Sequence, residues 1–212
     1  MFGITMPHLA AFVVIAVAVI VIPGPSVLFV VSRALSNGRR VAWLSVLGNT
    51  AGEYIQVVVV AFGLGALAEQ SLGLFTVLKL AGGLYLVYLG VKTFRERGQF
   101  VAQASGEQKR FRHPFIEGAI VGVTNPKTVV FLASILPQFV TLSAGHVAAQ
   151  ILFLGLIFSA IAVVSDSAWA LLAGVARNWF ARSPRRLAMM GGAGGLAITA
   201  IGLGLLVSGR RT

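Results

Sequence analysis

Residues 11–31 of the chain read AFVVIAVAVIVIPGPSVLFVV, and this stretch decides the fold. It holds no charged residue, and as a helix rising about 1.5 Å per residue it is long enough to cross the roughly 30 Å hydrocarbon core of a bilayer. It lacks the alternation of apolar and polar residues that marks a membrane β-strand. Because backbone polar groups in hydrocarbon must be paired internally, the stretch predicts a transmembrane helix, interrupted at Pro23-Gly24-Pro25.

Five further apolar segments follow in a chain of 212 residues, of which 57% are hydrophobic and 11% charged. A soluble domain does not tolerate so apolar a surface. Met1 to Pro7 holds no Lys or Arg, so the first segment lacks the basic start of a secretory signal and should be retained. We predict an all-α integral membrane protein, with six transmembrane helices in a single domain over residues 1–212. The segments are His8 to Ser32, Val41 to Leu67, Leu72 to Phe94, Phe115 to Gln138, Val147 to Ala176 and Leu187 to Ser208.

The formal charge of +11 comes from basic residues that gather in alternate connections between these segments. Thirteen lie on one side and two on the other, and basic loops face the cytoplasm. We therefore expect both termini to face outward, and we interpret the charge as a topology signal and not as a nucleic-acid site. The thirteen are Arg33, Arg39, Arg40, Lys92, Arg95, Arg97, Lys109, Arg110, Arg112, Arg177, Arg182, Arg185 and Arg186; the two are Arg210 and Arg211.

The two halves of the chain share three features in the same order. Each begins with a proline-interrupted segment, has one carboxylate in a later apolar segment, and ends with Ala-Gly-Gly-Leu and a further glycine. Because three helices per half is an odd number, the second half must enter the membrane in the opposite orientation. We predict inverted three-helix repeats at about 1–97 and 114–212, joined by a cytoplasmic linker at about 95–113. The matching features are Pro23-Gly24-Pro25 and Asn125-Pro126-Lys127, Glu53 and Asp166, and the glycine motifs beginning at Ala81 and Ala193.

Four ionisable residues are expected at bilayer depth within the apolar segments: Glu53, Asp166, Lys79 and Lys127. Each costs about 2.5 to 3.5 kcal/mol at the centre of a membrane helix, which makes each a candidate functional residue. A carboxylate that alternates between a cationic partner and an apolar environment can couple transport to protons. A static lysine–acid pair that fixes the helix register is the alternative, and Lys79 is near enough to its helix end to extend to the membrane surface.

The prolines at positions 23, 25 and 126 leave backbone groups unpaired at bilayer depth, which is tolerated where those groups line a cavity. Interrupted helices at corresponding positions of two inverted halves indicate a transporter's binding site. We expect N–H groups near Gly24 and Asn125 to suit a substrate carboxylate, and the freed carbonyls to suit an ammonium group.

Helical spacing adds secondary candidates. Asn49 lies four residues before Glu53 and Gln56 three after it, while Trp169 lies three after Asp166, so each shares a helix face with an acid. Simple helix packing explains these positions as well. Two aromatic residues of the third segment, Tyr85 and Tyr88, are further candidates for lining the same interior.

Taken together, these motifs resemble the LysE/RhtB family of amino-acid exporters over essentially the whole chain. The resemblance implies export of amino acids or close derivatives from the bacterial cytoplasm through the inner membrane, driven by the proton motive force. Family members often carry Asp after Gly near position 53, whereas here Glu53 follows Gly52. The matching motifs are Pro23-Gly24-Pro25, Lys79-Leu80-Ala81-Gly82, Tyr85-Leu86, Leu89-Gly90, Asn125-Pro126-Lys127, Leu136-Pro137-Gln138-Phe139 and Asp166.

Other functions are weighed by the residues that they would need. A cation or metal-ion exporter on the same scaffold stays open, because two buried carboxylates can bind a cation, although Lys127 beside them argues against it. The chain has no cysteine, which excludes a thiol-redox carrier. Its histidines, His8, His113 and His146, lie at segment ends or in loops, so we expect no enzymatic or metal site and no cofactor. A small-residue pair, Gly191 and Gly195, suits a homodimer or packing within the repeat.

Overall fold

The computed structural model describes residues 3–68, 72–97, 113–175 and 183–207, and all regular elements in these ranges are helices. The first apolar segment forms α1 (Met6–Val21) and α2 (Pro25–Asn37), which meet at an angle of 51°. The fourth forms α6 (Pro114–Val123) and α7 (Pro126–Val130), with a bend of 42° between them. Helix α7 continues into a π-helical turn, η1 (Phe131–Ile135), and then a 3₁₀ turn, η2 (Leu136–Phe139). Both interruptions lie at the predicted prolines.

The remaining helices are α3 (Arg39–Ala68), α4 (Leu72–Arg95), α8 (Val147–Val175) and α10 (Pro184–Val207), with a short 3₁₀ turn η3 (Leu142–Ala144) before α8. In the described ranges, α3 and α8 are each long and apolar enough to cross a membrane, and counting each bent pair as one span gives up to four crossings. Helices α4 and α10 have 24 residues each, and α10 contains a shorter apolar stretch, Gly191–Gly204. The protein is thus an all-helical membrane protein, and six crossings stay a prediction.

Proline and glycine set the helix ends around the first break. Helix α2 begins at Pro25; the first residue of a helix needs no N–H, because its N–H has no partner within the helix. The helix ends before Gly38, whose φ of +84° is favourable only for glycine. The expectation that Arg33 lies in a loop is therefore wrong. Because the helix continues to Asn37, Arg33 is buried within α2, and Arg39 and Arg40 begin α3.

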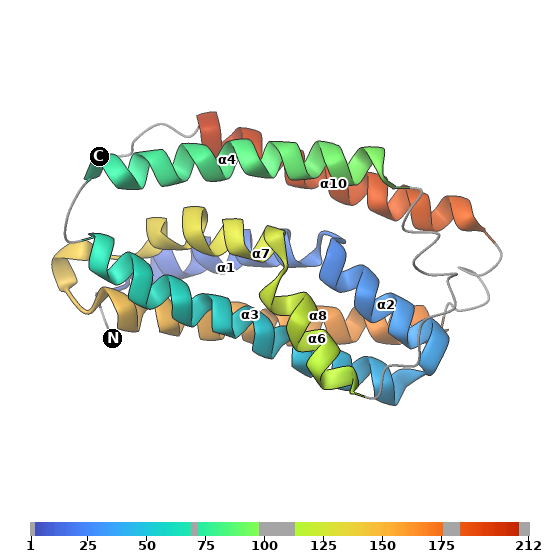
Figure 1. Ribbon diagram of the computed structural model, residues 1–212. Helices are drawn as coiled ribbons and strands as arrows, with labels where there is room; N and C mark the ends of the chain where they lie inside the picture. The colour runs from blue at the N-terminus through green and yellow to red at the C-terminus, as the bar shows by residue number, and fades with distance from the viewer. Residues whose placement is uncertain (1–2, 69–71, 98–112, 176–182, 208–212) are drawn as a thin grey trace.

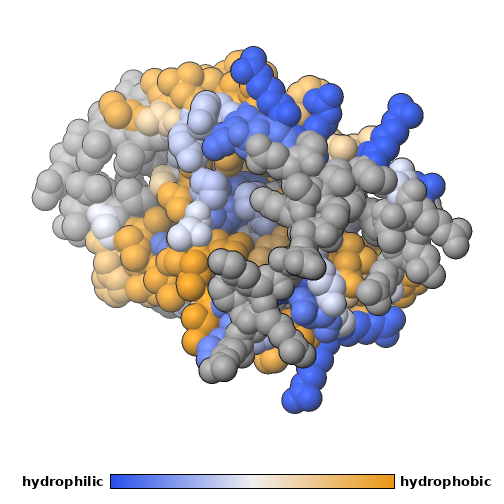
Figure 2. All heavy atoms as spheres, turned by 45° about the vertical axis from the view of Figure 1, so that its right-hand side comes forward, coloured by the Kyte–Doolittle hydropathy of each residue, from blue (hydrophilic) through white to orange (hydrophobic). Residues whose placement is uncertain are grey.

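The helices form three sets that lie one beside another (Figure 1). Helices α4 and α10 run side by side along one side of the molecule, and α1, α2 and α7 lie between this pair and the group of α3, α6 and α8. Large apolar side chains such as Val59, Phe62 and Val164 face outward. On the face drawn in Figure 2, hydrophilic side chains gather near the centre and project at the margins, with apolar side chains over the flanks. Such an apolar exterior is suited to lipid.

Helices α3 and α6 touch through their backbones. A Cβ atom on Gly52 would lie 2.1 Å from the carbonyl oxygen of Ala119, and one on Gly122 would lie 2.0 Å from that of Asn49. Small residues at such crossings are the usual means of close packing between membrane helices. This contact places Asn49 and Glu53 of α3 directly beside the break between α6 and α7.

Candidate functional site

Glu53 is the centre of a buried polar cluster at the two helix breaks. Its side chain is 4% exposed, and its Oε1 accepts hydrogen bonds from Thr128 Oγ1 at 3.1 Å and from Asn125 Nδ2 at 3.3 Å. Ser26 Oγ lies 3.4 Å from the same oxygen. Ser26 comes from the start of α2, and Asn125 and Thr128 come from the start of α7. The α3 carboxylate therefore receives donors from both half-helices that follow a break.

A hydrogen-bonded path connects Glu53 to the second predicted acid. Asn125 Nδ2 donates to Ser26 Oγ at 2.7 Å, and Ser26 Oγ donates to Asn49 Oδ1 at 2.9 Å. Asn49 Nδ2 in turn donates to Asp166 Oδ2 of α8 at 3.2 Å. Asp166 is also buried, and this path brings Glu53, Asp166, Asn49 and Asn125 together in one cluster.

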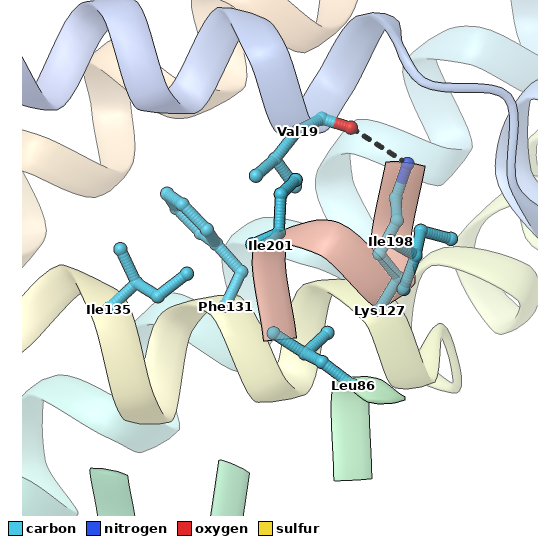
Figure 3. A pocket seen from close by; sticks show the side chains of 7 residues that line it. All are labelled: Val19, Leu86, Lys127, Phe131, Ile135, Ile198 and Ile201. Carbon is cyan, nitrogen blue, oxygen red and sulfur yellow. Dashed lines mark hydrogen bonds between the residues drawn. The ribbon is translucent and has the colours of Figure 1, made fainter. Parts of the chain in front are cut away.

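Lys127 reaches in the other direction, to the end of α1. Its Nζ donates to the carbonyl oxygen of Val19 at 3.1 Å (Figure 3) and to that of Ile22 at 2.9 Å. In an uninterrupted helix the Val19 carbonyl would accept from residue 23, but proline has no N–H to give. The ammonium group supplies the missing donor, and its charge is favourable at the C-terminal end of a helix.

Lys127 is closely enclosed at this position. A Cβ atom on Gly24 would lie 3.3 Å from its Nζ, so the glycine leaves room for the amine to pass. The space beside it, lined also by Leu86, Phe131 and Ile198, is about 10 Å³, which holds about one water molecule. Among the described residues, no ion pair joins Lys127 to Glu53 or Asp166. In this conformation the lysine thus caps α1 and does not pair with an acid.

Gln56 stabilises the second break. Its Nε2 donates to the carbonyl oxygens of Gly122 at 2.9 Å and Val123 at 2.7 Å, at the end of α6. The Gly122 carbonyl is four residues before Pro126 and so lacks its ordinary α-helical donor. Asn125 Oδ1 accepts from the backbone N–H of Lys127 at 3.1 Å and caps α7. Each break is therefore held by a side-chain nitrogen from another helix.

Some predicted residues lie elsewhere. Trp169 packs, partly buried, against an apolar cluster of α2, α3 and α8 that includes Val27 and Val30. Tyr85 and Tyr88 are exposed on α4 and do not line the interior. The side chain of Lys79 lies outside what the structure describes. In the described ranges no group of three or more His, Asp and Glu residues is placed to hold a metal ion.

A cleft of about 390 Å³ between α2 and α6 reaches the polar cluster. Asn125, which bonds both Ser26 and Glu53, forms part of its wall. The cleft is lined by Pro25, Leu28, Phe29, Ser32, Val121, Thr124, Asn125 and Pro126.

Four residues of the site region are not apparent from the sequence pattern. Ser26 and Thr128 follow the breaks by one or two residues, but a small hydroxyl side chain in a helix carries no signal of its own. Arg33 and Glu117 form a buried ion pair between α2 and α6. Arg33 is two helical turns after Ser26, and that spacing could have indicated that it shares a helix face with the cluster.

Comparison with known proteins places the chain in a family. The sequence matches the family described as LysE type translocator over residues 17–209. The homoserine/homoserine lactone efflux protein of Salmonella typhimurium is 31% identical over 188 residues, which cover 89% of this chain and 90% of that protein. The membrane protein YrhP of Bacillus subtilis is 29% identical over 84% of this chain and 89% of its own length. A membrane protein of Vibrio cholerae is 32% identical over 85% of this chain and 87% of its own length.

No solved structure matches the chain. The family match spans nearly the whole sequence, including both helix breaks, both buried acids and Lys127. This chain therefore belongs to the LysE-type translocators, a family of membrane transporters.

Proposed function

We propose that this protein exports an amino acid or a close derivative from the bacterial cytoplasm across the inner membrane, driven by the proton motive force. The observation that carries the proposal is the meeting of two helix breaks and two buried carboxylates in one hydrogen-bonded cluster. A membrane-embedded carboxylate is a functional site by default, and paired breaks are typical of transporter binding sites. The names of the Salmonella relatives add homoserine and its lactone as the compounds to test first.

The proposal includes two inverted three-helix repeats with both termini outside. The packing of α4 on α10 supports it: a Cβ on Gly90 would lie 2.6 Å from the Gly195 carbonyl oxygen, and one on Gly202 would lie 2.8 Å from that of Gly83. In the two sequence motifs Gly83 corresponds to Gly195, and Gly90 corresponds to Gly202. Each glycine therefore contacts the counterpart of the other glycine in its own motif. A two-fold axis between two equivalent antiparallel helices produces this pattern, because it maps the contact of Gly90 with Gly195 onto the contact of Gly202 with Gly83. In the same way Asn49 meets Asp166, and Val57 meets Gly155, so α3 and α8 run antiparallel.

The chemistry follows from the cluster. Glu53 and Asp166 would bind the transported proton or the substrate ammonium, and because Ser26 and Asn49 connect them, a change at one acid reorients the donors of the other. Backbone near Gly24 and Asn125 would bind the substrate carboxylate. Lys127 would leave the α1 carbonyls, pairing with an acid in one state and with the substrate carboxylate in another. The space of about 10 Å³ beside Lys127 is too small for an amino acid, so the lysine would have to move before a substrate carboxylate could bind there.

Export from whole cells tests the substrate class. Cells that overproduce the protein are fed dipeptides, and the amino acids released into the medium are identified by mass spectrometry. We expect homoserine or another amino acid to appear in excess over cells with an empty vector. Equal release of every amino acid from both would contradict the proposal.

Charge-neutral variants test the two acids. We expect Glu53→Gln and Asp166→Asn to fold, since each keeps the size of its side chain, but to lose the dependence of export on external pH. Glu96→Gln, in the turn that follows α4, is the matched control and should behave as the unaltered protein. Unchanged pH dependence in both variants would reduce the two acids to structural roles.

A further inference from the structure

We propose that the cleft between α2 and α6 is the substrate's route from the cytoplasm to the polar cluster, and that the Arg33–Glu117 ion pair is its gate, opened by the zwitterion of the substrate. This inference rests on the proposed function for the orientation in the membrane and for the substrate class. It goes beyond that function by assigning a recognition step to two residues outside the cluster of buried acids.

The ion pair lies next to the cleft, on the side away from the breaks. Arg33 Nη2 contacts Glu117 Oε2 between the two half-helices, and the side chains are only 8% and 14% exposed. Ser32 and Val121 line the cleft, while Arg33 is the next residue of α2 and Glu117 lies one turn before Val121 in α6. Beyond the pair, α2 ends and α6 begins at the linker, which the basic residues predict to be cytoplasmic.

The pair joins two elements that can move. Each half-helix is connected to its partner through a proline bend, and a cleft of about 390 Å³ separates α2 from α6 nearer the bends. A proline bend lacks a backbone hydrogen bond that would otherwise resist a change in the angle between the half-helices. A contact between charged side chains at the far end is thus positioned to hold the half-helices together or release them.

The two charges of the pair are complementary to those of a zwitterion. Glu117 Oε1 is buried, and no donor among the described residues bonds to it. An ammonium group has three N–H donors and could bond to this oxygen, while the planar guanidinium of Arg33 can bind a carboxylate through two parallel hydrogen bonds. An amino acid carries both groups on one carbon, so it satisfies both charges as the ion pair separates. A molecule whose ammonium group is capped leaves the Glu117 carboxylate without a cationic partner as the pair separates, which is strongly unfavourable for a buried charge.

Polar groups continue inward from the gate. Ser32 and Thr124 line the cleft, and Asn125 at its inner end donates to Ser26 and Glu53. A substrate released from Arg33 and Glu117 would therefore meet hydrogen-bonding partners on the way to the acids.

The absence of cysteine allows a direct test by thiol labelling. Leu28→Cys places a single reporter on the cleft wall, at a side chain that is 7% exposed. Everted membrane vesicles, whose cytoplasmic face is outward, are treated with a charged thiol reagent that does not cross membranes. We expect slow labelling with the pair intact and labelling about tenfold faster with Glu117→Gln, which corresponds to about 1.4 kcal/mol lost from the closed state. The control Glu96→Gln should leave the rate unchanged.

Ligands then separate a gate from a static ion pair. Homoserine should accelerate labelling when the pair is intact, whereas N-acetylhomoserine, which lacks the ammonium, should not. Labelling that is equal in Glu117→Gln and Glu96→Gln, or that responds equally to both compounds, overturns the inference. If Glu117→Gln does not fold, the double variant Arg33→Glu with Glu117→Arg is measured instead. It keeps an ion pair with the charges exchanged, so we expect slow labelling without homoserine, and rapid labelling would overturn the inference. Export of amino acids by the unaltered protein, measured separately, decides the proposed function.

Discussion

The backbone contact between α3 and α6 gives a stability prediction whose size follows from the structure. In Gly52→Ala the new Cβ would lie 2.1 Å from the Ala119 carbonyl oxygen, where ordinary contact begins at about 3.4 Å. Because both groups belong to helix backbones, α6 has to move away by about 1.3 Å. The two hydrogen bonds from Gln56 to the end of α6, now 2.7 and 2.9 Å, would then stretch to about 4 Å and be lost.

Two free-energy terms add up to the expected loss. A side-chain hydrogen bond inside a membrane protein contributes about 0.6 kcal/mol on average, so the two contribute about 1.2 kcal/mol. Forcing an extra methyl group into a packed interface typically adds about 1 to 3 kcal/mol. We expect Gly52→Ala to destabilise the protein by roughly 2 to 4 kcal/mol.

The same helix supplies the control. Gly63 of α3 has no atom within 4 Å of the position of its Cβ, so Gly63→Ala should be neutral or should stabilise the helix by up to about 1 kcal/mol. Both variants are purified in the same detergent and compared by the temperature at which half of the protein has lost its monodisperse peak in size-exclusion chromatography. A loss of 2 to 4 kcal/mol predicts a drop of at least about 4 °C for Gly52→Ala. Equal midpoints for the two variants would refute the contact.

Three further predictions concern the breaks. Gly194→Ala should lower the midpoint temperature more than Gly24→Ala. The new Cβ at position 194 would lie 2.2 Å from the Pro23 carbonyl oxygen, whereas the nearest neighbour of the one at position 24 is the flexible Lys127 amine at 3.3 Å. The reverse order would contradict the packing of α10 on the first break. Gln56→Leu should destabilise by about 1 kcal/mol in the same assay, since it removes two side-chain hydrogen bonds worth about 0.6 kcal/mol each, while the Gly122 carbonyl keeps its bond from the Asn125 N–H. A stability equal to that of the unaltered protein would show that Gln56 does not hold the end of α6. Lys127→Met should abolish export in the dipeptide assay, while Lys127→Arg, which keeps a cationic donor, should retain part of it; equal export by both would remove the charge from the mechanism.

The sequence was sufficient for features that depend on local chemistry. Proline interrupts a helix wherever it occurs, so the breaks at Pro23-Gly24-Pro25 and Asn125-Pro126-Lys127 were predictable from the residues alone. The same is true of Glu53 and Asp166, because a carboxylate in an apolar segment is unfavourable unless the fold provides partners. Their proximity followed from assuming that the two halves are related.

Features that depend on distant contacts could not be predicted. The partners of Lys127 lie at the end of α1, 108 residues away for Val19, and only the folded arrangement brings them together. Gln56 was expected near Glu53, but one helical turn carries its amide to the α6 carbonyls instead. The fall in hydropathy at the first charged residue predicts a loop at Arg33, whereas the helix continues until Gly38 allows the chain to turn.

Efflux from liposomes tests the central claim, that the two buried acids couple export to protons, most directly. The purified protein is reconstituted into liposomes that contain labelled homoserine, and efflux is followed with the external medium either more acidic than the lumen or at equal pH. We expect external acid to accelerate efflux through the unaltered protein and through Glu96→Gln, and to have no effect on efflux through Glu53→Gln and Asp166→Asn. Efflux through the unaltered protein at the same rate with and without the pH difference would contradict the account.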